Sequence, residues 1–175
     1  MKSFLVIVDM QNDFIDGVLG TKEAAKIIDR VVNKINNFSG EIVVTLDTHY
    51  ENYVETSEGR RLPLHCVKGK KGWKLNNKVT NALNGKSYSV IEKVTFGSVE
   101  LPHIISKLAD DERFTVELVG VCTDICVVSN ALLLKAHFPE AEITVDASCC
   151  SGTTPKAHKT ALDIMRNGLI NITGN

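Results

Sequence analysis

The sequence predicts a single α/β domain over residues 1–175. It is expected to be a Rossmann-like three-layer sandwich with about six mostly parallel strands and helices on both faces. Short apolar runs alternate with helical patterns along the whole chain, as in parallel α/β folds. Most of these runs lack polar alternation, which indicates strands buried on both faces. The length of 175 residues and the 43% apolar content suit one domain with one core.

The elements follow one another in a regular order. Apolar runs predict strands at residues 4–8, 42–46, 89–92, 116–119, 143–145 and 169–172. Helical spacing predicts helices at 22–38, where Thr21 suits the N-cap, and at 98–109 and 124–137, with a shorter one within 73–83. Pro155 and Gly168 suit the two ends of a helix over 155–167. Residues 48–72 show no periodicity, and loops of this length are often functional.

Composition excludes several function classes. A net charge of −1 argues against a generally basic nucleic-acid surface. The first apolar run is too short for a signal core or a membrane span, which predicts a cytoplasmic protein with no membrane partner. Five cysteines are an odd number, which fits reduced thiols better than a disulfide framework. The sequence leaves both a monomer and a homo-oligomer open.

Reactive side chains follow four consecutive predicted strands. Asp9 ends the first, Asp47 and His49 follow the second, Lys93 ends the third, and Cys126 follows the fourth. Because ligands bind at the carboxyl ends of parallel strands, these residues are expected at one edge of the sheet. No G-x-G-x-x-G motif follows the first strand, so a dinucleotide site is not expected.

Cys126 is the candidate nucleophile. A thiol in the first turn of a helix can have its pKa lowered from ~8.5 to ~3.5–7.5, and the N–H groups of that turn could hold an oxyanion. Asp9 could take its proton and Lys93 could stabilise the thiolate. The alternatives are a buried small hydrophobe for Cys126, a solvated carboxylate for Asp9 and a surface ammonium for Lys93. Thr123 and Asp124 are interpreted as helix-start residues.

A metal site is predicted in the long loop. Asp47 and His49 lie two residues apart after a strand, and His65 could close the site. Glu51, Glu55 and Glu58 are the candidate carboxylates between them. Such mixed ligands suit one divalent ion: Zn²⁺ is preferred here, with Mn²⁺ or Fe²⁺ as alternatives. The competing interpretation is a polar loop with ordinary hydrogen bonds.

Four segments resemble the isochorismatase-like cysteine hydrolases, and within them the nicotinamidase branch. They are Val8 to Phe14, Asp47-Thr48-His49, Lys93 to Ser98, and Gly120 to Val127, and the resemblance covers nearly the whole chain. It implies a triad of Asp9, Lys93 and Cys126, a cis peptide before Cys122, and an oxyanion hole from the N–H groups of Cys122 and Cys126. It also implies metal ligands Asp47, His49, His65 and Glu58, and substrate contacts from Phe14, Leu62 and Val121.

The resemblance implies an enzyme that hydrolyses nicotinamide to nicotinate and ammonia through a thioester. Phe14 matches an aromatic residue that stacks on the pyridine ring, whereas Leu62 stands where many nicotinamidases have a second aromatic. Because of Leu62, the alternative function is a cysteine hydrolase that acts on another small amide, ureido or carbamoyl substrate. A non-catalytic binding module is a third alternative, disfavoured because Asp9, Lys93 and Cys126 are all present.

Overall fold

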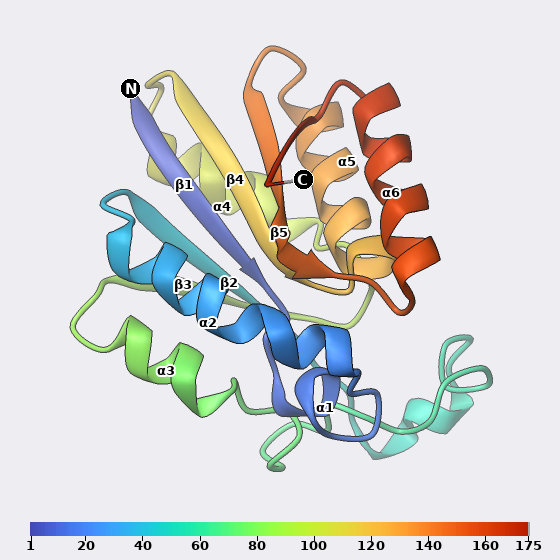
Figure 1. Ribbon diagram of the computed structural model, residues 1–175. Coiled ribbons are helices and arrows are strands. Elements are labelled where there is room, and N and C mark those ends of the chain that lie inside the picture. The colour runs from blue at the N-terminus through green and yellow to red at the C-terminus, as the bar shows by residue number, and fades with distance from the viewer. Residues whose placement is uncertain (175) are drawn as a thin grey trace.

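The computed structural model describes residues 1–174 and contains one parallel six-stranded sheet (Figure 1). The strand order is β3-β2-β1-β4-β5-β6, which confirms the predicted fold class. The strands are β1 (Lys2–Val8), β2 (Glu41–Asp47), β3 (Tyr88–Lys93), β4 (Phe114–Val121), β5 (Glu142–Ser151) and β6 (Asn171–Thr173).

Helices cover both faces of the sheet. One apolar layer packs β1, β2 and β4 against α1 (Asn12–Ile15), α2 (Lys22–Asn37) and α3 (Asn77–Leu83). The other packs the opposite face against α4 (Glu100–Ala109), α5 (Val128–His137) and α6 (Pro155–Asn167). Successive side chains of a strand point to opposite faces. Leu5 and Ile7 therefore enter the first layer, whereas Phe4, Val6 and Val8 enter the second.

Several predicted boundaries were wrong. The expected helix over 73–83 is only α3, which begins after its N-cap Asn76. The last strand begins at Asn171 because Leu169 has a left-handed φ of 63° and the turn after α6 continues through Ile170. Strand β5 is much longer than residues 143–145 and includes Cys149 and Cys150, both buried. The sequence analysis also missed α1, a 3-10 helix η1 (Glu51–Glu55), and the π-helical turn η2 (Thr123–Val127) that precedes α5.

The strand order indicates where on the sheet a ligand would bind. The chain leaves β1 toward β2 and β3 on one side, and later returns to β4 on the other side of β1. Ligands bind outside the carboxyl ends of the strands at such a reversal. Asp9 follows β1 and Cys126 follows β4, so both lie at the reversal point. Gly120 permits the close pairing there: its φ is 121°, and a Cβ would lie 2.1 Å from the Val8 carbonyl oxygen.

Among residues 1–174, no helix is long and apolar enough to cross a membrane.

Candidate active site and metal cluster

Asp9, Lys93 and Cys126 meet in the interior at the carboxyl edge of the sheet. The Lys93 Nζ lies 2.7 Å from Asp9 Oδ2 and 3.4 Å from Cys126 Sγ. Their exposed fractions are 0% for Asp9, 3% for Lys93 and 4% for Cys126. A lysine this buried requires charged partners. The surface-ammonium interpretation of Lys93 is therefore wrong, as is the solvated-loop interpretation of Asp9.

The two carboxylate oxygens of Asp9 have different partners, Thr45 for one and Lys93 for the other. Its backbone has a left-handed φ of 49°, uncommon for a residue other than glycine. Thr45 Oγ1 donates a hydrogen bond of 2.6 Å to Asp9 Oδ1. Oδ2 faces the Lys93 ammonium and, among the described residues, has no other well-aligned hydrogen-bond donor. Oδ2 is therefore the oxygen available to accept a proton from Cys126.

The environment of Cys126 does not depress its pKa as the sequence analysis expected. Complete burial raises the pKa of Cys126, and the Asp9 carboxylate raises it further, although Lys93 opposes both. Burial also raises the pKa of Asp9 against the opposing charge of Lys93. Cys126 is therefore a thiol at rest, and the raised Asp9 pKa makes that carboxylate a better proton acceptor.

Cys126 lies in η2, directly after β4. The peptide bond between Val121 and Cys122 is cis, as the resemblance implies. Asn130, fully buried on α5, joins this turn to the segment after Lys93. Its Nδ2 donates to the Cys126 carbonyl at 2.8 Å, and its Oδ1 accepts from Ser98 N at 2.9 Å. The sequence analysis missed Asn130 because a polar residue in a helical pattern carries no sign of burial.

Thr123 and Asp124 are the first two residues of η2, which confirms the helix-start interpretation, although neither side chain caps the helix. The Thr123 Oγ1 instead lies 2.8 Å from His158 Nδ1 on α6. The Asp124 carboxylate accepts hydrogen bonds from Thr153, in the loop between β5 and α6. The Thr123 side chain thus contacts α6, and the Asp124 side chain contacts the loop that precedes α6.

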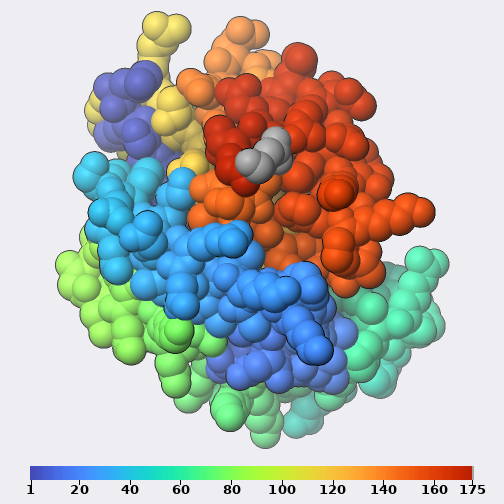
Figure 2. Space-filling model, viewed as in Figure 1, coloured from blue at the N-terminus to red at the C-terminus, as the bar shows by residue number. Residues whose placement is uncertain are grey.

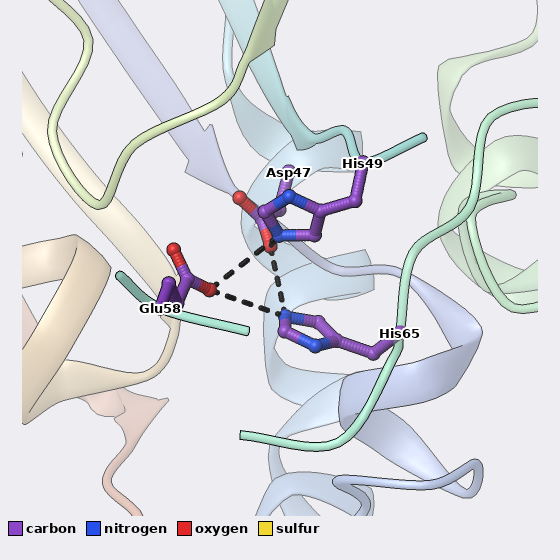
Figure 3. Close-up of side chains that lie close together, drawn as sticks. All are labelled: Asp47, His49, Glu58 and His65. Carbon is purple, nitrogen blue, oxygen red and sulfur yellow. Dashed lines mark hydrogen bonds and ion pairs between the residues drawn. The ribbon is translucent and has the colours of Figure 1, made fainter. Parts of the chain in front are cut away.

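Asp47, His49, Glu58 and His65 converge beside the triad (Figure 3). One ligand atom from each lies within 4.8 Å of the others. Asp47 Oδ2 lies 2.9 Å from His49 Nε2 and 3.1 Å from His65 Nε2. Glu58 Oε1 lies 3.5 and 3.7 Å from the same two nitrogens. Two imidazoles and two carboxylates are a donor set that suits a divalent transition metal.

Surrounding groups hold three of the four cluster residues in place. His65 Nδ1 is 2.8 Å from the Pro63 carbonyl oxygen, which leaves the Nε2 lone pair free for a metal. Tyr53 donates to Glu58 Oε1 at 3.1 Å. The side-chain amide of Gln11, fully buried, forms two 2.8 Å bonds with the backbone of Asp47. Gln11 is a structural residue of the site that the sequence analysis did not single out.

The electrostatics of the cluster favour a cation. Burial raises the pKa of Asp47, but hydrogen bonds from His49 and His65 and the charge of Lys93 outweigh it and hold that pKa well below its usual range. Burial lowers the pKa of His49, yet Asp47 and Glu58 outweigh it and raise the pKa to about 9. The two carboxylates thus stabilise positive charge where the ligand atoms converge.

Asp47 links the two centres. Its Oδ2 contacts the histidines, while Oδ1 lies 3.2 Å from Lys93 Nζ.

A cavity of about 240 Å³ opens onto both centres. Its walls include the expected Phe14, Leu62, Cys122 and Cys126, and the cluster residues Asp47, Glu58 and His65. Val121 is not among the lining residues: its side chain is fully buried in the core beneath α2. The sequence analysis missed Leu19, Thr21, Phe96, Ile125 and Thr153. Phe96 and Ile125 lie within the motif segments Lys93 to Ser98 and Gly120 to Val127, whereas Thr153 comes from a distant loop and had no local signal.

Comparison with known proteins agrees with this geometry. The family model described as "Isochorismatase domain" matches residues 3–174. A Bacillus subtilis (strain 168) protein described as an uncharacterized isochorismatase family protein, PncA, is 28% identical over 179 residues, 97% of each chain. The pyrazinamidase of Pyrococcus horikoshii, solved in complex with zinc, is 27% identical with a TM-score of 0.86 and complete coverage of both chains.

A second solved structure extends this similarity. The pyrazinamidase/nicotinamidase of Streptococcus mutans UA159 is 27% identical with a TM-score of 0.83, over 97% of this chain and 99% of that one. Together the family match and these structures support an amide hydrolase.

Proposed function

Because the chain belongs to the isochorismatase family, we propose that it is a metal-containing cysteine amidohydrolase that converts nicotinamide to nicotinate and ammonia. One observation carries the proposal: Cys126, which lies against the buried Lys93–Asp9 pair, lines the same cavity as Asp47, Glu58 and His65 of the cluster. A nucleophile with an adjacent base is needed to cleave an amide. The adjacent cluster suits a substrate with a heteroatom to be positioned.

The chemistry follows from the triad. Asp9 takes the proton of Cys126, and the thiolate attacks the amide carbonyl carbon to form a C–S bond. The backbone N–H groups of Cys122 and Cys126 are the proposed donors to the resulting oxyanion. Asp9 then gives its proton to the departing nitrogen, which leaves as ammonia. Water, deprotonated by Asp9, cleaves the thioester and releases the acid and the thiol. The Lys93 ammonium keeps the local charge balanced while the proton moves.

The proposed metal ligands are Asp47, His49, Glu58 and His65. Zinc is the preferred ion because the Pyrococcus relative was solved with it; Mn²⁺ and Fe²⁺ suit the same donors. When bound, the ion supplies a contact that orients a substrate heteroatom, such as the pyridine nitrogen. The bonds at the amide are made and broken by Cys126 and Asp9.

The cavity walls set the proposed substrate class. Phe14 offers one aromatic face to a ring, while Leu62 offers an aliphatic contact. A wall of this kind suits a small planar amide. A cytoplasmic location also stays a prediction, consistent with all five cysteines being free.

Ammonia release from a small-amide panel tests the proposal. Nicotinamide and pyrazinamide should be substrates, and benzamide, which lacks the ring nitrogen, should be much poorer. Cys126→Ala provides the background rate. If a non-aromatic amide or a ureido compound is the better substrate, the assignment of nicotinamide as substrate is wrong, but the assignment as a cysteine hydrolase still holds. If no amide is cleaved, the binding-module alternative is favoured.

Elemental analysis tests the metal site. One equivalent of metal should co-purify with the wild type and be lost in Asp47→Ala. Retained metal in Glu58→Ala would mean that Glu58 is not an essential ligand. A metal-free wild type whose activity is unaffected by exhaustive chelation or by Asp47→Ala would refute the site.

A further inference from the structure

Asp124 connects the nucleophile turn to the loop between β5 and α6. Its Oδ1 accepts a 2.8 Å hydrogen bond from the Thr153 backbone N–H, and its Oδ2 accepts a 2.6 Å bond from the Thr153 hydroxyl. Both donors of Thr153 are thus engaged by one carboxylate. Hydrogen bonds to an ionised acceptor are the stronger kind. The contact joins residues 29 positions apart in the sequence.

A second contact, between Thr123 and His158, also joins the Cys126 turn to the region after β5. Thr123, adjacent to Asp124 and fully buried, places its Oγ1 2.8 Å from His158 Nδ1 on α6. Burial lowers the pKa of His158. A neutral imidazole can accept the Thr123 hydroxyl hydrogen on Nδ1. Two consecutive residues of the turn that carries Cys126 therefore hold the loop and the first turns of α6.

Gly152 makes the approach of the loop possible. A Cβ at this position would lie 2.8 Å from Asp124 Oδ1 and 2.8 Å from His158 N. The loop therefore passes too close to both contacts for a larger residue. Gly152 thus allows the loop to lie directly against Asp124 and the start of α6.

The loop forms part of the substrate cavity. Thr153 lines the cavity together with Cys122, Ile125 and Cys126 from the nucleophile segment, and with Glu58 and Leu62 from the opposite wall. Figure 2 shows the orange β5–α6 region beside the teal segment that carries Glu58 and Leu62. Because Asp124 takes both Thr153 donors, Thr153 presents no free donor to the cavity.

We propose that Asp124 is a positioning residue that holds Thr153 in place as a wall of the substrate pocket and thereby sets substrate affinity. The inference rests on the proposed function for its kinetic consequence, but not for the contact itself. The nucleophile is oriented separately through Asn130 and Lys93. Loss of Asp124 should therefore impair substrate binding more than the chemical step.

Amide hydrogen exchange tests the contact without reference to catalysis. Exchange at residues 152–154 should be faster in Asp124→Ala than in the wild type. The matched control is Asp163→Ala, which removes an acidic residue that pairs with Arg166 on the exposed side of α6 and should leave the loop unchanged. Unchanged exchange in Asp124→Ala would overturn the proposal, whether or not the chain hydrolyses amides.

Steady-state kinetics on the best wild-type substrate test the consequence. Asp124→Ala should raise KM about five- to ten-fold and change kcat less than about two-fold, because the lost contacts hold substrate in ground and transition states alike. Asp124→Asn should largely restore KM, since its amide oxygen can still accept the Thr153 N–H. Thr153→Val alone should raise KM, but the double variant Asp124→Ala with Thr153→Val should have a KM little higher than that of Asp124→Ala, as expected for coupled residues.

The rate at which iodoacetamide alkylates Cys126 separates the pocket role from an effect on the nucleophile. This small reagent should react at the wild-type rate in Asp124→Ala. If alkylation and kcat fall together while KM is unchanged, Asp124 acts through the nucleophile turn and the proposal is wrong. Thr153→Val keeps the backbone contact, so it remains informative if Asp124→Ala fails to fold.

Discussion

Replacing Lys93 by methionine should destabilise the protein in a pH-dependent way. Lys93 is 3% exposed and lies 2.7 Å from Asp9 and 3.2 Å from Asp47. Methionine fills similar volume but leaves Asp9 as a buried carboxylate without a counter-charge. Removing one partner of a buried ion pair typically costs about 3–5 kcal/mol. Asp47 keeps its two histidine contacts, so Asp9 should carry most of the penalty.

Protonation of Asp9 limits that cost. An unfolded aspartate has a pKa of ~3.9, and each unit of pH above it costs about 1.36 kcal/mol to keep the folded group neutral. The penalty should therefore be at most about 4 kcal/mol at pH 7 and about 1.5 kcal/mol at pH 5. The sign follows from the pKa of Asp9 being raised in the folded variant: stability is present at low pH and is lost as pH rises.

Thermal and urea unfolding of both proteins at pH 5 and pH 7 provide the measurement. The largest penalty at pH 7 corresponds to a Tm difference of about 8–16 °C for a chain of this size. The double variant Asp9→Asn with Lys93→Met removes both charges and should be more stable than Lys93→Met alone at pH 7. A penalty below about 1 kcal/mol at pH 7, or one that does not shrink at pH 5, would refute the buried ion pair.

Three other predictions follow from the structure. Cys126→Ala should abolish turnover, whereas Cys122→Ala should be far milder because only the backbone of Cys122 is assigned a role; equal losses at equal stability would mean the nucleophile is misassigned. Leu62→Trp should lower KM for nicotinamide several-fold with little change in kcat, since an aromatic pair adds ~0.5–1.5 kcal/mol; Michaelis–Menten analysis checks this, and a rise in KM with unaltered folding would contradict it. Lys34 bridges Asp146 and Glu117 at 2.8 Å each. Burial raises the pKa of Asp146, but hydrogen bonds from Lys34 and Ser148 outweigh it and lower that pKa, so this contribution is present above the unfolded pKa and lost as pH falls. Asp146→Asn should therefore lower the free energy of unfolding by about 1–2 kcal/mol at pH 7 and change it little below about pH 3. Urea unfolding at both pH values checks this, and a difference between variant and wild type that does not vary with pH would contradict the reasoning.

The fold class and the residues proposed for the chemistry could be predicted from the sequence. Unbroken apolar runs indicate strands buried on both faces, because every residue of such a strand packs against other apolar residues. Asp9, Lys93 and Cys126 could be predicted to meet because the carboxyl ends of parallel strands share one edge. The structure brings these three residues into contact. The residue types of the candidate metal cluster could be predicted, but its geometry could not.

Other features depend on how the strands and helices pack together. Periodicity reports local burial but says nothing of which strands are neighbours, so the reversal of strand order between β1 and β4 was not predictable. Glu51, Glu55 and Glu58 looked alike in an aperiodic loop, yet only Glu58 reaches the histidines. Tyr53 holds its side chain, and a long-range bond from Cys66 N to Asp13 Oδ2 holds the loop.

The pKa of Cys126 and the partners of Thr123 and Asp124 depend on the same kind of information. A helix start alone favours a thiolate, but burial and the nearby Asp9 carboxylate reverse that preference. Hydroxyl and carboxylate groups at a helix start suit caps, but here β5 and α6 bring Thr153 and His158 within reach. In each case the deciding neighbour comes from a distant part of the chain, so it becomes known only once the elements have packed together.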